Sequence, residues 1–185
     1  MRIISGTARG RQLATFPGGN IRPTPDRVRE ALFSILTSRL GSFQGLRVLD
    51  LFSGTGAQAL EALSRGAEQA VLVDSGAEAA GIIEENIRRC RCESNARLIR
   101  EDAFRALPTL AAEPFDLILL DPPYRQGLIP QIIEMIESLN ILKENGIICA
   151  ESEKKVPSIT CQTLNLLDDR VYGSVRIRLY GLPED

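Results

Sequence analysis

Four consecutive residues, Asp121-Pro122-Pro123-Tyr124, place an acid, two residues without a backbone N–H and an aromatic ring directly after an apolar run. The proline rings hold the backbone stiff, and their carbonyl groups are acceptors. The Asp121 carboxylate and a neighbouring carbonyl can accept both hydrogens of an exocyclic amine, while the Tyr124 ring stacks on the base that carries it. The four residues are therefore candidate catalytic residues for chemistry on a planar amino nitrogen. A rigid turn after a strand is the alternative interpretation.

A glycine-rich turn follows Asp50, and its pattern Gly54-x-Gly56-x-x-Ala59 fits the dinucleotide-binding fingerprint. Asp74 ends the next apolar run, where an acid would hold a ribose hydroxyl, so a dehydrogenase is one interpretation. Asp50 argues against it, because its carboxylate would lie where a pyrophosphate approaches the helix. A cationic ligand suits that acid. S-adenosylmethionine, with an ammonium and a sulfonium beside adenosine, is the expected cofactor, and a turn that binds no ligand is the remaining alternative.

Histidine is absent from the chain, and its four cysteines form no Cys-x-x-Cys pair. The sequence therefore predicts no zinc or other metal site, and it excludes Ser-His-Asp and Cys-His catalysis. Reduced, partly buried thiols are the expected state of Cys90, Cys92, Cys149 and Cys161.

The charge is unevenly spread, although the net charge is only −2. Residues 1–47 contain eight arginines, no lysine and two acids, which gives them a net charge of +6 and the remainder −8. Guanidinium groups bind phosphates bidentately, so this region predicts contact with a nucleic acid, and a solvated basic face is the alternative. The candidate phosphate contacts are Arg9, Arg11, Arg22, Arg27 and Arg29, of which Arg27 could instead pair with Glu30.

The elements that must position these residues show two different sequence patterns, one before residue 46 and one after it. Residues 3–13 have the glycines and short apolar pieces of a small hairpin, and a helix begins after Thr24, with Pro25 at its first position, and ends near Gly41. From residue 46 onward, short apolar runs alternate with helical stretches that end near residues 65 and 91 or cover 129–142. The predicted strands are 46–51, 70–74, 96–100, 115–120 and 147–151.

Alternation of this kind predicts an α/β fold with a mostly parallel sheet and helices on both faces. The tail, with segments 161–167 and 171–180, is expected to form a closing antiparallel hairpin. A length of 185 residues fits one domain with an appendage. We therefore expect a basic N-terminal extension over 1–45 and a cofactor-binding domain over 46–185. No apolar run reaches roughly 18 residues and no signal peptide is evident, so the protein is expected to be cytoplasmic, without membrane contact.

Taken together, these segments resemble the class I S-adenosylmethionine-dependent methyltransferases, with their Rossmann-like sheet, and more narrowly the RsmD family. That family methylates the N2 amine of a guanine in 16S ribosomal RNA. The resemblance covers nearly the whole chain, and its most specific pieces are Arg22-Pro23-Thr24 and Leu32-Phe33. It also rests on Ile4-Ser5-Gly6, Gly10-Arg11, Arg27-x-Arg29-Glu30-Ala31, Asp50 to Gly56, and Asp121 to Tyr124.

The resemblance implies roles for individual residues and a partner. Asp50, Phe52, Gly54 and Gly56 would line the methionine end of the cofactor, Asp74 would hold the ribose, and Asp102-Ala103 would lie by the adenine; Thr24 joins the arginines as an RNA contact. The implied partner is 16S ribosomal RNA or a partly assembled small subunit, bound by a monomer. The resemblance also implies that the sheet has the strand order of the methyltransferases, with an antiparallel seventh strand from the tail.

Asp121 is expected mainly to orient the amine, because an aspartate of ordinary pKa is a weak base. Two other interpretations stay open. The same motif suits a methyltransferase for adenine N6 in DNA or for a protein glutamine, and a binding protein with a vestigial site is the non-enzymatic interpretation.

Overall fold

Seven strands and five helices form the part of the chain that the structure, a computed structural model, describes: residues 1–17, 26–123 and 126–183. The strands are β1 (Arg47–Leu51), β2 (Gln69–Val73), β3 (Ala96–Ile99), β4 (Phe115–Leu120), β5 (Leu142–Glu153), β6 (Asn165–Tyr172) and β7 (Val175–Gly181). The helices are α1 (Asp26–Leu40), α2 (Ala57–Ser64), α3 (Ala77–Cys90), α4 (Ala103–Thr109) and α5 (Leu128–Leu139).

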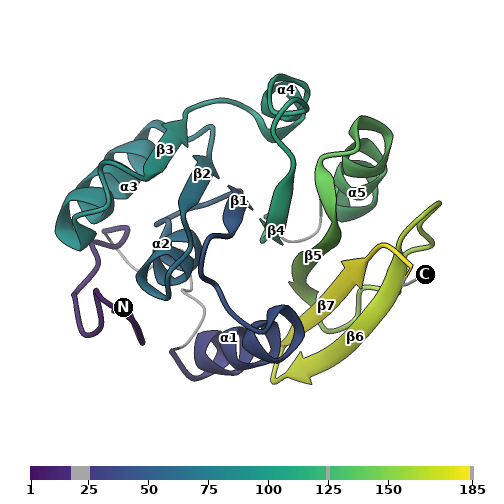
Figure 1. The fold of residues 1–185 in the computed structure, drawn as a ribbon, viewed down its shortest axis with the longest axis horizontal. Coiled ribbons are helices and arrows are strands. Elements are labelled where there is room, and N and C mark those ends of the chain that lie inside the picture. Colours follow the sequence, from purple (N-terminus) through teal and green to yellow (C-terminus); the bar gives the residue numbers. More distant parts are fainter. Residues whose placement is uncertain (18–25, 124–125, 184–185) are drawn as a thin grey trace.

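The strands make one sheet in the order β3-β2-β1-β4-β5-β7-β6 (Figure 1). Strands β1 to β5 pair in parallel, β7 is antiparallel to β5, and β6 is antiparallel to β7. The prediction of a mostly parallel sheet closed by an antiparallel hairpin is confirmed, and so is the strand order that the resemblance implied. Strand β1 pairs with both β2 and β4, so it lies at the centre of the parallel part.

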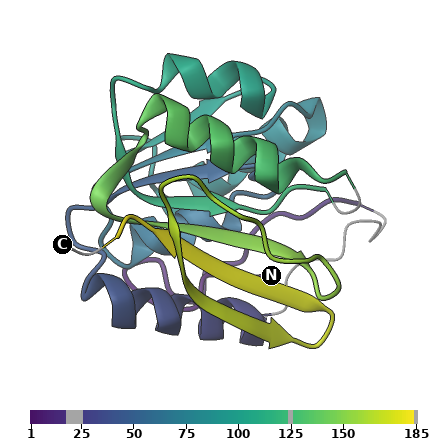
Figure 2. The ribbon, with the colours of Figure 1, turned by 90° about the vertical axis from the view of Figure 1, so that its right-hand side faces the viewer.

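Helices cover both faces of the parallel part of the sheet, which explains why its strands β1, β2 and β4 are mostly apolar. In β1, Val48 belongs to the core beneath α1, α2 and α3, whereas Leu49 and Leu51 belong to the core beneath α4 and α5. Figure 2 shows the same arrangement, with α5 in green above the sheet and α1 in dark blue below it. In β1, β2 and β4, nearly every residue is therefore buried whichever way it points.

Two boundaries and one helix between β3 and β5 differ from the sequence prediction. Helix α5 ends at Leu139 because Asn140 takes a left-handed conformation (φ 51°), and β5 then begins at Leu142, earlier than expected. Helix α4 was not predicted; its one signal is Asp102, whose side chain caps the helix by accepting from the Phe104 N–H.

The tail hairpin turns later than predicted. Gly173 (φ 64°) lies in the turn, so Asp168 and Asp169 belong to β6 and not to a loop. Both oxygens of Asp169 accept from Arg176 at 2.7 Å, a bidentate pair across the hairpin. A charged pair in a half-exposed strand is invisible to a search for apolar alternation, which explains the shift.

The N-terminal residues form a loose antiparallel pair, as predicted. Arg2 and Gln12 make an isolated bridge, and the Ile3 N–H donates to the Arg11 carbonyl at 3.0 Å. Helix α1 ends next to Gly41, again as predicted, while its expected start at Thr24 and Pro25 lies outside the described residues. No helix in the described ranges is both long and apolar enough to span a bilayer.

Candidate active site

A row of acids follows the carboxyl edge of the parallel strands. The register pairs Leu51 with both Val73 and Leu120, and Leu120 with Ala150, so the residues beyond them meet at one edge of the sheet. Ligands of open α/β sheets bind at this edge. In sheet order from β3 to β5, the acids at or just beyond the strand ends are Asp102, Asp74, Asp50, Asp121 and Glu151.

Asp50 lies at the centre of the row and is 3% exposed. One carboxylate oxygen accepts from the Ala59 N–H of α2 at 3.2 Å. Burial raises the pKa of Asp50 to about 7; the Ala59 hydrogen bond works in the opposite direction, and the charge of Asp74 adds a smaller increase. A cation beside this carboxylate would favour its charged form, so the position suits an ammonium or sulfonium ligand.

The glycine turn between β1 and α2 needs left-handed backbone at three positions. Gly54 and Gly56 have φ values of 57° and 74°, and Phe52 has 63° despite its side chain. A Cβ at Gly56 would come within 2.8 Å of Leu72, whereas nothing lies within 4 Å of a Cβ at Gly54. The absence of a side chain at Gly56 thus lets the turn pack closely against Leu72, whereas the space beside Gly54 is open. The strain at Phe52, about 1–3 kcal/mol, is typical of a ligand-binding turn.

Asp74 holds the turn in place from the end of β2. Its two carboxylate oxygens accept from the N–H groups of Gly54 at 2.8 Å and Gly76 at 2.9 Å. Each oxygen keeps a second lone pair, so the carboxylate can still accept from a ligand hydroxyl. The prediction that Asp74 faces the same site as the glycine turn agrees with this geometry.

Asp102 reaches the same edge one strand further along, after β3. It is exposed, and one of its oxygens caps α4 through the Phe104 N–H at 3.0 Å. Ala103 is 4% exposed and packs in the core beside α4. Any contribution of Ala103 to a ligand would therefore come from its backbone.

Asp121 follows β4 directly and is half-buried, while Pro122 is buried and Pro123 is exposed. Burial raises the pKa of Asp121 well above its ordinary value, and the charges of Glu151 and Asp50 raise it further. The expectation of an ordinary, weakly basic carboxylate is therefore wrong. Tyr124, the fourth predicted catalytic residue, lies outside the described residues.

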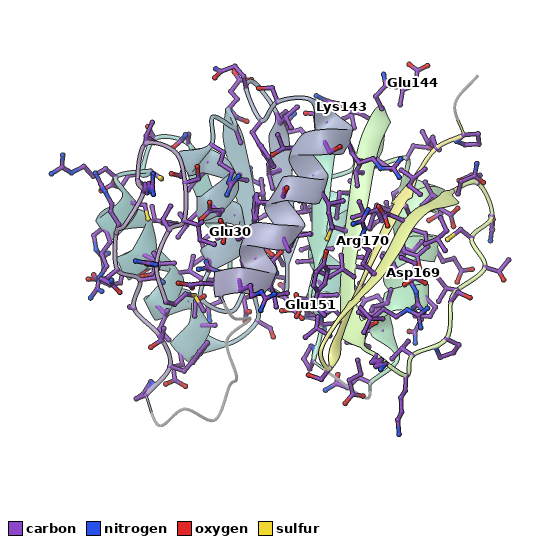
Figure 3. All side chains as sticks on the ribbon, turned by 90° about the horizontal axis from the view of Figure 1, so that it is seen from below. Glu30, Lys143, Glu144, Glu151, Asp169 and Arg170 are labelled. Atoms are coloured by element: carbon purple, nitrogen blue, oxygen red, sulfur yellow. The ribbon has the colours of Figure 1, made fainter. Side chains whose placement is uncertain are left out.

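Glu151 is the residue at this edge that the sequence analysis did not assign to the site. It is 3% exposed and lies near the end of β5, at the opposite end of the strand from Lys143 and Glu144 (Figure 3). The pKa of buried Cys149 is raised by burial and then by Glu151, Asp121 and Asp50, which places these three acids in one neighbourhood. The available signal was that Glu151 ends the last apolar run.

The predicted phosphate contacts in the N-terminal segment have different environments. Arg9 is exposed, and Arg11 is half-buried because its guanidinium donates to the carbonyl of Arg89 at 2.5 Å. Arg22 and Thr24 lie outside the described residues. Arg9 and Arg11 therefore lie on a segment that is fixed to α3.

Arg29 requires a correction, because its side chain is 1% exposed and cannot reach a phosphate in solution. It donates to the carbonyl of Arg2 at 2.5 Å and to Asp26 at 2.8 Å, so it joins α1 to the N-terminal segment. Arg27 is exposed, and the i, i+3 ion pair of this helix end forms between Asp26 and Arg29 rather than between Arg27 and Glu30. Spacing on a helix could not tell which arginine points inward.

Comparisons with known proteins agree with this geometry. The family model described as Conserved hypothetical protein 95 matches residues 1–181. The chain is 35% identical to proteins named ribosomal RNA small subunit methyltransferase D from Haemophilus influenzae and Escherichia coli, over 97% of the chain and 93% and 89% of those proteins. A solved Escherichia coli structure described as a candidate methyltransferase superposes with a TM-score of 0.81 at 32% identity, covering 98% of this chain and 97% of that one.

Proposed function

Since the chain belongs to the family described as Conserved hypothetical protein 95, the RsmD family, we propose that it methylates the N2 amine of a guanine in small-subunit ribosomal RNA. The methyl donor is S-adenosylmethionine. The substrate follows from the names of the relatives and from the family resemblance, whereas the reaction type also rests on the geometry of the site.

The observation that carries the proposal is the pairing of β1 with β4. The glycine turn follows β1 and Asp121 follows β4, and the register aligns Leu51 with Leu120. The charge of Asp50 raises the pKa of Asp121, so the two carboxylates are close enough to interact. These observations support our assignment of the cofactor turn and the amine-binding residues to one edge of the sheet of a single chain, an arrangement that a monomer can provide.

The residues of the turn fit the cofactor. The buried Asp50 suits the ammonium of its methionine part, Gly54 leaves room for its approach, and Asp74 retains lone pairs for the ribose hydroxyls. We place Phe52 and Gly56 along the same turn, and Asp102 with the backbone of Ala103 beside the adenine. When bound, S-adenosylmethionine supplies an electrophilic methyl carbon on a sulfonium.

Asp121 has two tasks in this mechanism. Its carboxylate and the Pro122 carbonyl accept the two hydrogens of the amine, which directs the nitrogen lone pair out of the ring plane and toward the donor. Because its pKa is raised, Asp121 is also a better proton acceptor than an ordinary aspartate once the nitrogen has been methylated. Pro123 holds the loop stiff, and Tyr124 stacks on the base.

The N-terminal region, residues 1–45, provides the RNA contact. The exposed Arg9 and Arg27, with the half-buried Arg11, are the described residues that we assign to phosphates, and Arg22 and Thr24 join them from the family motif. Residues 46–185 carry the cofactor and the chemistry.

Transfer of labelled methyl groups tests the proposal. Purified protein and tritiated S-adenosylmethionine are incubated with under-methylated small ribosomal subunits, free small-subunit RNA, DNA and bulk protein, and the products are digested to nucleosides and amino acids. Label in N2-methylguanosine is expected. Label in N6-methyladenine or methylglutamine would select one of the other amine substrates, and no transfer to any of the four would refute the function.

A further inference from the structure

Asn86 of α3 connects two parts of the molecule that the proposed function keeps separate. It is 0% exposed. Its side-chain oxygen accepts from the Ala14 N–H at 2.6 Å, and its side-chain nitrogen donates to the carbonyls of Ala14 at 3.0 Å and Thr55 at 2.9 Å. Ala14 belongs to the N-terminal segment that carries Arg9 and Arg11, and Thr55 lies between the two glycines of the cofactor turn.

Every hydrogen-bonding group of the Asn86 side-chain amide is used. Both N–H bonds and the oxygen of Asn86 have partners, and only an amide offers two donors and an acceptor in this arrangement. The three hydrogen bonds are partly buried, and a fully buried polar group that loses its partner costs about 1–3 kcal/mol, so neither Ala14 nor Thr55 can move away from Asn86 freely. The segment and the turn must therefore shift together or break a partly buried hydrogen bond.

The N-terminal segment has other attachments, and these separate the role of Asn86 from simple docking. One turn further along α3, Arg89 donates to the Gln12 carbonyl at 3.3 Å and accepts from Arg11 through its own carbonyl. Arg89 holds the segment, but its hydrogen bonds do not reach the turn. Only the Thr55 bond of Asn86 and a weak contact from the Thr55 hydroxyl to the Met1 sulfur at 3.5 Å join segment and turn among the described hydrogen bonds.

We propose that Asn86 is a positioning residue that couples RNA contact on the N-terminal segment to cofactor binding in the glycine turn. RNA that binds the segment and limits its remaining motion also limits the motion of the Thr55 carbonyl, and through it that of the turn. The cofactor then meets a turn that is already ordered, so each ligand strengthens the binding of the other by the same factor. This inference rests on the proposed RNA contact.

The test is a thermodynamic cycle with S-adenosylhomocysteine, which binds without reacting. Its Kd is measured by calorimetry with and without saturating small-subunit RNA, for the wild-type protein, Asn86→Ala and Arg89→Ala. For the wild-type protein, the ratio of the Kd without RNA to the Kd with RNA is expected to be about five or more, within the usual range of coupling between sites. Asn86→Ala should lower it to about one, whereas Arg89→Ala should weaken RNA binding and keep the ratio.

A ratio of one in the wild-type protein, or an unchanged ratio in Asn86→Ala, would overturn the inference. Should Asn86→Ala fail to fold, hydrogen exchange of residues 53–57 in the wild-type protein decides, because RNA is expected to slow it and no change contradicts the coupling. Methyl transfer to RNA without coupling removes this inference alone. Coupling without methyl transfer removes the proposed activity instead.

Discussion

Asp50 and Asp121 are carboxyl groups whose ionisation depends on what the crevice holds. In both, burial is the main cause of the raised pKa, and each also feels the charge of another acid in the row. A cationic cofactor reverses both effects, since it replaces lost solvation and offsets the repulsion. The same acids that repel each other without a ligand therefore favour a cofactor with two positive centres.

Cofactor affinity should consequently rise with pH. Asp50 has a pKa of about 7 and must be ionised to bind a cation, so the competent fraction grows as the pH passes through that value. Between about pH 6 and pH 8 we expect a roughly tenfold gain in affinity for S-adenosylhomocysteine, measured by calorimetry. Asn in place of Asp50 should weaken binding at pH 8 by about 10- to 100-fold and flatten the dependence on pH. A wild-type affinity that does not change with pH would exclude Asp50 as the partner of the ammonium.

Asp121→Asn should separate catalysis from cofactor binding. The amide can accept one hydrogen from the substrate amine but cannot take its proton, so kcat should fall by roughly 10²- to 10³-fold. The Kd of S-adenosylhomocysteine should stay within about threefold, because other residues hold the cofactor. Asp116→Asn is the matched control, since Asp116 lies near the start of the same strand and binds Lys143 and the Arg47 N–H instead. Equal turnover of the two variants would remove Asp121 from the mechanism.

Among the elements, the N-terminal segment is fixed to α2 by a buried acid. The two oxygens of Glu61, which is 0% exposed, accept from the N–H groups of Ile4 at 2.7 Å and Ser5 at 3.0 Å. The Ser64 carbonyl accepts from Thr7 at 2.8 Å. A segment with little regular structure thus has a defined position beside the cofactor turn.

Gly6 makes this docking possible, and its replacement should loosen it. Gly6 and Gly10 share a φ of 82°, but a Cβ at Gly6 would lie 1.7 Å from the Ser64 carbonyl oxygen, whereas nothing lies within 4 Å of one at Gly10. Gly10→Ala should cost only the backbone strain, about 1–2 kcal/mol. Gly6→Ala adds the clash, so its Tm should fall several degrees further and its RNA affinity should drop. Equal Tm values in thermal unfolding would mean that the segment is not docked on Ser64.

The elements also show which strands and site residues sequence patterns can predict and which they cannot. Apolar runs ending in Asp50, Asp74 and Asp121 predicted strands and site residues together, because the ends of parallel strands share an edge. Glu151 was missed since nothing in the sequence says that its strand lies beside the one before Asp121. The burial of Arg29 was missed for a similar reason, because the helix periodicity does not reveal which face the N-terminal segment covers.

In the whole molecule, the N-terminal region and the sheet share one core. Ile3, Leu13 and Phe33 pack in the same cluster as Val48 and Leu117 of the central strands. The division that we propose, into an RNA-contact region and a cofactor domain, is therefore one of function only, because the described residues of the two parts share this core. The strand order came only from the family resemblance, because periodicity identifies strands without ordering them.

RNA binding by this body should depend steeply on salt. Each phosphate contact that is lost should lower the slope of log K against log salt by about 0.7 to 0.9. Arg9→Ala, Arg11→Ala and Arg27→Ala are each expected to lower it by about that amount in filter-binding titrations. Exposed Arg105 of α4, outside the proposed contact region, is the control, and Arg105→Ala should leave the slope unchanged. If the RNA affinity of the wild-type protein did not depend on salt, these arginines would be ordinary surface charges and not phosphate contacts.

The central claim is that the turn after β1 and the loop after β4 face one crevice in which donor and acceptor meet. A crystal structure with bound S-adenosylhomocysteine tests it most directly. We expect the amino group of the ligand beside Asp50, its ribose on Asp74 and its sulfur on the side of Asp121. A ligand bound away from the glycine turn, or one whose sulfur faces away from Asp121, would contradict the account.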